Sequence, residues 1–329
     1  MEKQKIEFEQ IVECGCGLDV HKETVVATIR GKDKREQARS FSTFTSSLTE
    51  LRDWLKKEGV THVAMESTGI YWKPVFNILE EDFQLLLVNA RHIKNVPGHK
   101  TDKSDSAWIA QLLLSGLLKK SFVPPRDIRE LRDLFRYKKK LVGQTSSERN
   151  RLQKILEDAN IKLSSVVSDV FGVSATKMLD AMIDGETNVK KLAKLCHGRL
   201  SGKKQQIKEA LNGHLTEHHK FMLNIIRKNI HGIESVIEEV ERKIEQQSAV
   251  HKIHIEQLQS ITGVGKATAT GIIAEIGADM SIFPNEHHLA SWAGMSPGNN
   301  ESAGKKKRTN HAWKQILENN AGGSRLGSQ

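Results

Sequence analysis

Residues 17–30 read GLDVHKETVVATIR and are rich in valine, isoleucine and threonine, with a partial alternation of apolar and polar positions. Such residues favour extended backbone. The segment GKDK at 31–34 interrupts the run, and REQARSFST resumes it at 35–43. The stretch therefore predicts a β-hairpin at the beginning of the fold.

Helical and extended patterns alternate after this hairpin. Residues 46–59 place Leu48, Leu51, Trp54 and Leu55 at helical spacing behind a serine pair and end at a glycine. The later segments, in order, read as a strand at 62–66, a helix at 71–82, a strand at 83–90 and a helix at 104–118. Alternation of this kind predicts a mixed α/β sheet with helices on its faces, in a first domain of residues 1–125.

The pattern changes after Pro124 and Pro125. Residues 126–160 are dense in arginine and lysine on a helical period, and a second long helical pattern covers about 221–257. Two such helices predict an antiparallel hairpin or coiled coil, with a smaller helical insertion at 161–220. We assign residues 126–256 to this helical linker region. Its basic run tracks a nucleic-acid backbone or is a solvated face.

The charge balance points to a polyanionic partner. The chain has 329 residues, enough for at least two domains, and its 50 lysines and arginines exceed its 40 acids by ten. An excess of positive charge favours DNA or RNA over an acidic small substrate, although many ordinary soluble proteins are also basic.

Export and membrane insertion are not indicated. The charged beginning MEKQKIEFEQ has no apolar core, and no apolar run reaches the length of a membrane span. Three cysteines, Cys14, Cys16 and Cys196, are too few for a paired framework, so we interpret them as structural thiols. These features predict a cytoplasmic protein with no membrane partner.

A third segment opens with LQSITGVGKATATGIIAEIG at 258–277. Gly263 and Gly265 stand between two short helical patterns and resemble a helix-hairpin-helix, in which backbone N–H groups near Lys266 bind phosphate. The alternative is a plain turn between helices. We assign residues 257–329 to a mostly α C-terminal domain.

Four acids are candidates for a metal site. Asp19 lies inside the first strand, Glu66 ends the strand at 62–66, and Asp102 and Asp105 are three apart at a helix start. If these elements meet, four carboxylates converge, and such a cluster requires a divalent cation such as Mg²⁺, which suits phosphoryl transfer. Alternatively, Asp102 and Asp105 are an N-cap and a first-turn acid, and Glu66 caps a helix or lies on the surface.

The stretch SPGNNESAGKKKR at 296–308 holds a second candidate, Ser302. It is either an ordinary loop serine or a nucleophile beside four cations that neutralise a DNA backbone: Lys305, Lys306, Lys307 and Arg308. Tyr71 and Trp72 follow a glycine, where exposed rings stack on unpaired bases or, alternatively, bury themselves at a helix start.

Five ordered motifs together resemble the insertion-sequence one-ten family of transposases. They are GLDVHKET at 17–24, MESTGIYWKPV at 65–75, KTDKSDSAWIAQLL at 100–113, ITGVGKATATGIIAEIG at 261–277 and LASWAGMSPGNNESAGKKK at 289–307. The resemblance implies an RNase H-like (RuvC-like) DEDD domain joined through a coiled coil to a C-terminal transposase domain. The matching residues are Asp19, Glu66, Asp102 and Asp105 for the Mg²⁺-binding tetrad and Ser302 for the catalytic serine.

The same resemblance implies the partners and the reaction. Family members use a structured non-coding bridge RNA that pairs with the target DNA and with the ends of their own element. They then recombine the strands through a covalent serine–DNA intermediate. The resemblance therefore implies that DNA and RNA are the partners and that the protein is a homo-oligomer, either a dimer or a tetramer.

The end of the sequence departs from the family pattern. TNHAWKQILENN begins a helix, but AGGSRLGSQ then follows without an apolar period, so we expect a shortened C-terminal domain. Two alternatives therefore stay open. One is a metal-dependent Holliday-junction nuclease with a structural Ser302, and the other is an inactive copy that only binds nucleic acid.

Overall fold

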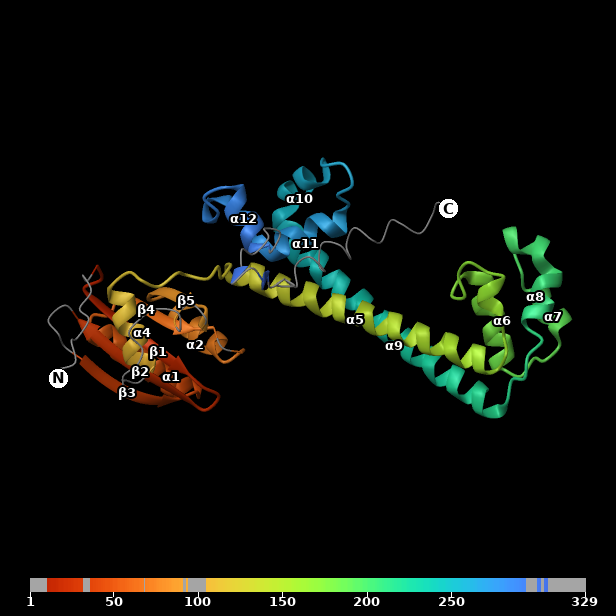
Figure 1. Ribbon diagram of the computed structural model, residues 1–329, viewed down its shortest axis with the longest axis horizontal. Helices are drawn as coiled ribbons and strands as arrows, with labels where there is room; N and C mark the ends of the chain where they lie inside the picture. The colour runs from red at the N-terminus through yellow and green to blue at the C-terminus, as the bar shows by residue number, and fades with distance from the viewer. Residues whose placement is uncertain are drawn as a thin grey trace. The chain divides into compact units, whose positions relative to one another are not determined.

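The computed structural model (Figure 1) describes residues 11–31, 36–67, 69–90, 93, 105–293, 301–302 and 305–306. The chain divides between Val123 and Pro124 into two compact units. Each unit has hydrophobic clusters of its own. The division into three functional domains stays a prediction, because two compact units do not show which segment performs which function.

A five-stranded mixed sheet forms the centre of the first unit. Its strands are β1 (Cys14–Val20), β2 (Thr24–Gly31), β3 (Glu36–Ser42), β4 (His62–Glu66) and β5 (Gln84–Val88). In space the order is β3-β2-β1-β4-β5, with antiparallel pairing among the first three and parallel pairing from β1 to β4 and β5. The predicted hairpin and mixed sheet are confirmed, and the order is consistent with an RNase H-like domain.

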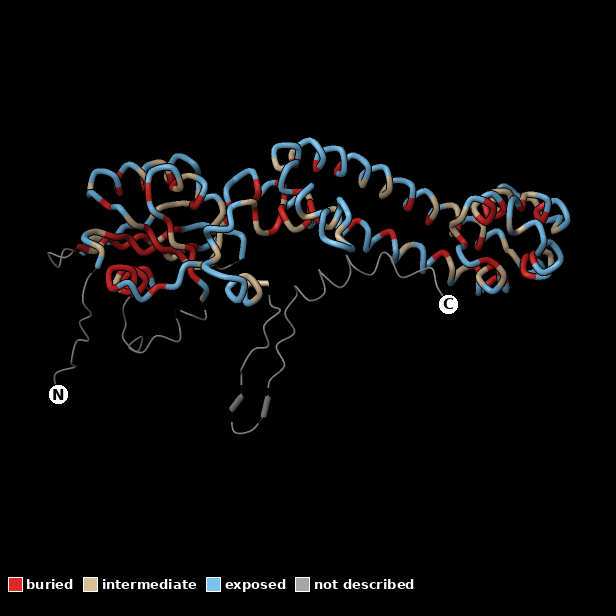
Figure 2. The backbone as a smooth tube through the Cα atoms, turned by 90° about the horizontal axis from the view of Figure 1, so that it is seen from above, coloured by how far each residue is buried: buried red, intermediate tan, exposed pale blue. Residues whose placement is uncertain are grey.

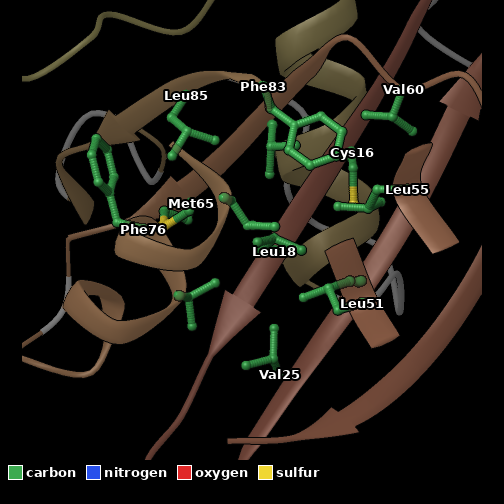
Figure 3. Packing of buried hydrophobic residues seen from close by; sticks show 14 of the residues in the cluster. Cys16, Leu18, Val25, Leu51, Leu55, Val60, Met65, Phe76, Phe83 and Leu85 are labelled. Carbon is green, nitrogen blue, oxygen red and sulfur yellow. The ribbon is translucent and has the colours of Figure 1, made fainter. Parts of the chain in front are cut away.

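One face of the sheet is covered by α1 (Thr45–Lys57) and α2 (Trp72–Leu79). The four apolar residues whose spacing predicted α1 are all buried. Figure 3 shows this cluster, in which Leu18 of β1 and Met65 of β4 lie among side chains such as Leu51 of α1 and Phe76 of α2. Full burial of one such side chain stabilises the fold by roughly 1.5–3 kcal/mol.

The opposite face is covered by α4 (Asp105–Leu114). Ala64 of β4 packs in a second cluster with Trp108, Ile109 and Leu112 of α4. Because side chains alternate along a strand, Ala64 faces α4 while its neighbour Met65 faces α1 and α2. The sheet is therefore sandwiched between helices. Its strands β1, β2, β4 and β5 are largely buried (Figure 2), whereas β3 at the edge has no buried residue.

Two long helices, α5 (Arg126–Asp158) and α9 (Glu217–Ser248), lie side by side in the second unit (Figure 1). The predicted second helix ends earlier than the pattern suggested. It ends at Ser248, and the short η3 and the helix α10 follow it directly. The pairing is antiparallel, because shared clusters contain Leu131, Leu141, Val240 and Ile244 at one end and Leu152, Leu156, Leu223 and Ile226 at the other.

A small helical module follows α5, in agreement with the predicted insertion. It contains η1 (Leu163–Ser165), α6 (Val173–Ile183), α7 (Val189–Lys194), η2 (Gly198–Lys203) and α8 (Lys204–Ala210). Met178, Leu192 and Ile207 join the cluster that also holds the end of α5 and the start of α9. The module therefore has a continuous apolar core with one end of the helix pair.

The remaining elements follow α9 along the chain. They are η3 (Ala249–His251), α10 (Lys252–Gln259), α11 (Lys266–Ile276), η4 (Met280–Ile282), α12 (Glu286–Trp292) and the two-residue strands β6 (Glu301–Ser302) and β7 (Lys305–Lys306). Ile128 of α5 packs with Ile255 of α10 and Ile273 of α11. Within the described ranges, no helix combines the length and apolar character needed to cross a membrane.

Candidate functional site

Asp19 lies one residue before the end of β1, on the face covered by α4. A Cβ on Gly17 would lie 2.2 Å from the Ser106 carbonyl oxygen of α4, so Gly17 faces that helix. Asp19 is two residues further along the strand and faces the same way. Its side chain is about one quarter exposed and accepts a hydrogen bond of 3.0 Å from His21 Nε2. Sequence reasoning missed His21, whose only signal is its place two residues after Asp19.

Glu66 ends the neighbouring strand β4 on the same face. β1 and β4 are parallel, and their register pairs Leu18 with Met65, so Asp19 and Glu66 stand at corresponding positions at the same edge of the sheet. Ala64, two residues before Glu66, packs against α4. Strand alternation therefore places the half-buried Glu66 on the α4 side beside Asp19.

Asp105 is brought to this edge by the direction of α4. Gly17 lies against Ser106 and Ala110, whereas Gly15 lies against Leu113, so α4 runs antiparallel to β1. Its first residue, Asp105, therefore lies toward the end of β1 that carries Asp19. The Thr28 and Ser106 hydroxyls, both buried, hydrogen-bond at 2.8 Å and fix the first turn of α4 over the hairpin.

Two of the four predicted acids, Asp19 and Glu66, thus share one face and one edge of the sheet, and a third, Asp105, begins the helix that covers this face. Asp102, the fourth, lies outside the described residues. Within the described ranges, no three His, Cys, Asp or Glu side chains are close enough together to form a metal-binding group. The carboxylate oxygens are the hard ligands that divalent cations prefer, so the donor set suits such an ion.

Ser302 lies in a short hairpin of the second unit. β6 pairs antiparallel with β7, and the register places Ser302 opposite Lys305 and Glu301 opposite Lys306. Lys307 and Arg308, the other two predicted phosphate-binding cations, lie outside the described residues. The pairing therefore sets Ser302 across from a lysine.

The glycine pair between α10 and α11 makes a turn that depends on one glycine. Gly263 has φ of +88°, a left-handed conformation that favours glycine, and Gly265 is the N-cap residue of α11. The Lys266 ammonium lies 2.6 Å from Glu245 Oε1, and this bond lowers the pKa of the Glu245 carboxyl. One predicted phosphate ligand thus has an intramolecular partner.

Tyr71 and Trp72 differ in exposure. Tyr71 is exposed just before α2, whereas Trp72 packs edge-to-face on Phe76 at a centroid distance of 5.6 Å and borders the core cluster. Trp72 thus has the surroundings of an aromatic residue at a helix start, while Tyr71 presents its ring to solvent.

The basic run on α5 forms ion pairs with neighbouring helices. Lys138 pairs with Glu241 at 2.6 Å, and Arg149 pairs with Glu234 at 2.9 Å. From the sequence, we predicted that these cations face nucleic acid or solvent. The sequence did not indicate that acids of α9 are their partners, because these contacts form only when two distant helices pack together.

Two family models match parts of the sequence that hold the candidate residues. Residues 16–161, which include the four acids, match the family model DEDD_Tnp_IS110, described as a transposase. Residues 255–316, which include the glycine turn and Ser302, match a model described as Transposase IS116/IS110/IS902 family. No curated protein gives a match. Transposases process DNA, and the two matches together span more than half of the sequence. The chain therefore belongs to the IS110 family of transposases.

Proposed function

We propose that the protein recombines DNA by nucleophilic attack of Ser302 on the DNA backbone, with Asp19, Glu66, Asp102 and Asp105 holding Mg²⁺. The observation that carries the proposal is the parallel register of β1 and β4, which sets Asp19 and Glu66 side by side on the face that α4 covers. Two carboxylates at one partly buried edge repel each other unless a cation lies between them.

The residues present suit a divalent cation by the chemistry of their oxygen ligands. Such an ion, when bound, neutralises the charge that develops on the phosphate during transfer. The Asp105 carboxylate lies in the first turn of α4, where the positive end of the helix dipole attracts negative charge. His21 holds Asp19 in one orientation through the 3.0 Å hydrogen bond.

In the proposed reaction, Ser302 Oγ bonds to phosphorus as its proton leaves to solvent. The bond from phosphorus to one DNA oxygen breaks, and that oxygen takes up a proton. A hydroxyl group of another strand then reverses the attack and regenerates Ser302. Lys305, opposite Ser302 in the hairpin, and Lys306 neutralise the phosphates on either side.

A structured bridge RNA and a homo-oligomer belong to the same proposal. The resemblance of the five motifs supports RNA guidance, and the exposed ring of Tyr71 suits stacking on an unpaired base. An oligomer lets the serine of one protomer serve the carboxylates of another. Its interface is proposed along the α5–α9 pair, interpreted as a coiled coil.

The turn at Gly263 and Gly265 is proposed to bind phosphate as a helix-hairpin-helix. The φ of +88° at Gly263 supports a tight hairpin, and Gly265 brings the first N–H groups of α11 to the surface. Lys266 exchanges its bond with Glu245 for a DNA phosphate in this proposal.

The decisive experiment compares the wild-type protein with Ser302→Ala and Asp19→Asn. Matched controls are Ser147→Ala and Asp53→Asn, which change exposed residues of α5 and α1. Strand transfer is measured with the DNA ends and RNA of the element and Mg²⁺. We expect both site variants to lose strand transfer and retain nucleic-acid binding, while the controls stay active.

Two other results would replace this proposal. Cleavage that survives Ser302→Ala but not Asp19→Asn identifies a metal-dependent nuclease of branched DNA. A wild-type protein that binds nucleic acid with Mg²⁺ and RNA, yet never cuts, identifies a protein that only binds.

A further inference from the structure

A strongly basic stretch lies in the small helical module, far along the chain from the candidate site. Residues 188–208 contain six lysines and one arginine and no aspartate or glutamate. The α7–α8 basic surface is defined here by the six lysines Lys190, Lys191, Lys194, Lys203, Lys204 and Lys208.

The module core holds these lysines in place. Leu192 of α7 and Ile207 of α8 are buried in the same cluster, and the two helices pack side by side (Figure 1). All six lysines except the half-buried Lys208 are exposed. Burial raises the pKa of the Cys196 thiol, and the positive charge of Lys204 opposes this rise.

Most lysines of this surface lack a carboxylate partner of the kind that Lys138 and Arg149 of α5 have. Among the described residues, Lys191 alone has a carboxylate partner, Glu186 at 3.2 Å. Lys203 donates to the Val166 carbonyl at 3.1 Å. The pairs Lys190–Lys194 and Lys204–Lys208 stand four residues apart on their helices, where like charges destabilise a helix. A bound polyanion would remove this repulsion.

The character of the surrounding residues favours a nucleic acid over a protein partner. No large apolar side chain described between residues 188 and 208 is exposed. Protein interfaces are anchored by buried aromatic and aliphatic side chains and are depleted in lysine. Lysine ammonium groups bind phosphate as point charges without reading sequence.

We propose that the α7–α8 basic surface binds the phosphodiester backbone of a nucleic acid, as a contact separate from the candidate active site. This inference rests on the proposed function, because that function is the reason for choosing a nucleic acid over another polyanion. RNA and DNA share this chemistry, and the experiment distinguishes them.

The test uses the full-length triple variant Lys190→Gln, Lys194→Gln and Lys204→Gln. A matched control replaces three exposed lysines that lie outside this surface and outside the basic run of α5: Lys57→Gln in α1, Lys162→Gln after α5 and Lys177→Gln in α6. Fluorescence anisotropy measures binding of a labelled RNA hairpin, a labelled DNA duplex and a labelled polyglutamate peptide. Measurements run over a series of KCl concentrations in EDTA.

We expect the triple variant to bind the nucleic acid at least roughly tenfold more weakly at low salt. The slope of log affinity against log salt concentration should fall by an amount that corresponds to the loss of about two to three phosphate contacts. The control retains wild-type affinity within about twofold, since its lysines lie outside the proposed surface. A loss for RNA alone assigns RNA to the surface, a loss for duplex alone assigns DNA, and a loss for both assigns the shared backbone. The variant with arginine at the same three positions retains binding and excludes a folding defect.

Three outcomes overturn the inference. Equal losses in the triple variant and the control attribute binding to net charge, and unchanged affinity in both removes the surface from nucleic-acid binding. A loss confined to polyglutamate assigns an acidic protein partner. EDTA prevents metal-dependent cleavage, so binding is measured separately from strand transfer. The binding assay can therefore contradict this inference, and the strand-transfer assay of Ser302→Ala and Asp19→Asn can contradict the proposed function, each without the other.

Discussion

Gly17 of β1 lies so close to Ser106 of α4 that a Cβ on the glycine would stand 2.2 Å from the Ser106 carbonyl oxygen and 2.4 Å from the Ala110 amide nitrogen. Real atoms do not approach this closely, so the absence of a side chain at Gly17 allows α4 to rest on β1. The position of Asp105 relative to Asp19 depends on this approach.

Replacement of Gly17 by alanine should displace α4. The clash involves backbone atoms, so we expect a loss of at least about 2 kcal/mol of unfolding free energy, and strand transfer should fall with it. Urea denaturation measures the loss. The matched control is Gly143→Ala in α5, where no atom lies within 4 Å of the added Cβ and helix propensity improves. Equal stability of the two variants would show that α4 does not depend on Gly17.

Loss of one candidate ligand should weaken the response to Mg²⁺. We expect millimolar Mg²⁺ to raise the unfolding temperature of the wild-type protein by roughly 2–4 °C through mass action. Asp19→Asn should show a smaller rise, and Asp53→Asn, on the exposed side of α1, should respond like the wild type. Differential scanning fluorimetry with and without Mg²⁺ measures the shifts. An identical rise in all three proteins would exclude Asp19 as a ligand.

Glu275 is the buried counter-ion for two arginines of α5. Arg132 Nε lies 3.2 Å and Arg136 Nη2 lies 3.0 Å from Glu275 Oε2. Burial lowers the pKa of Arg132, and Glu275 opposes this effect. We expect Glu275→Gln to reduce the unfolding free energy by about 2–4 kcal/mol, because it removes the buried charge that pairs with the partly buried Arg132.

The comparison for this variant is an exposed ion pair of the same unit. Glu234→Gln removes the pair with Arg149, both of whose side chains are more than one third exposed. Such a change should alter stability by less than about 1 kcal/mol. If chemical denaturation gives the same loss for both variants, burial does not strengthen the Glu275 contacts.

The thiol of Cys16 should make stability depend on alkaline pH. Burial raises its pKa above the ordinary value of 9.0, with a smaller contribution from Cys14. Above about pH 9 the unfolded chain loses the Cys16 proton while the folded protein keeps it. The contribution of this group to stability should then fall by about 1.4 kcal/mol per pH unit. Denaturation between about pH 8 and pH 10.5 should show a shallower decline for Cys16→Ala, and parallel declines would contradict the effect.

Sequence periodicity predicted the first unit because local rules act there. The spacing of Leu48, Leu51 and Trp54 indicates α1 without knowledge of its neighbours, since one apolar face must be buried. Asp19 was conspicuous because an acid inside a strand needs a reason, and its place at a sheet edge beside Glu66 follows from the parallel register.

Contacts between distant segments were not predictable in the same way. Glu275 reads as an ordinary polar position of a short helix until α11 packs on α5 and meets Arg132. Lys266 reads as a phosphate ligand until α9 supplies Glu245. These partners are more than 20 residues away in sequence or belong to separate helices, so only the tertiary fold decides which cation is paired.

The α5–α9 pair also sets a length scale. Helices of 33 and 32 residues extend about 50 Å at 1.5 Å per residue. A duplex lying along them would cover about 15 base pairs at 3.4 Å each. If a duplex binds along the pair, removal of two turns from both helices should shorten a nuclease-protection footprint by about three base pairs.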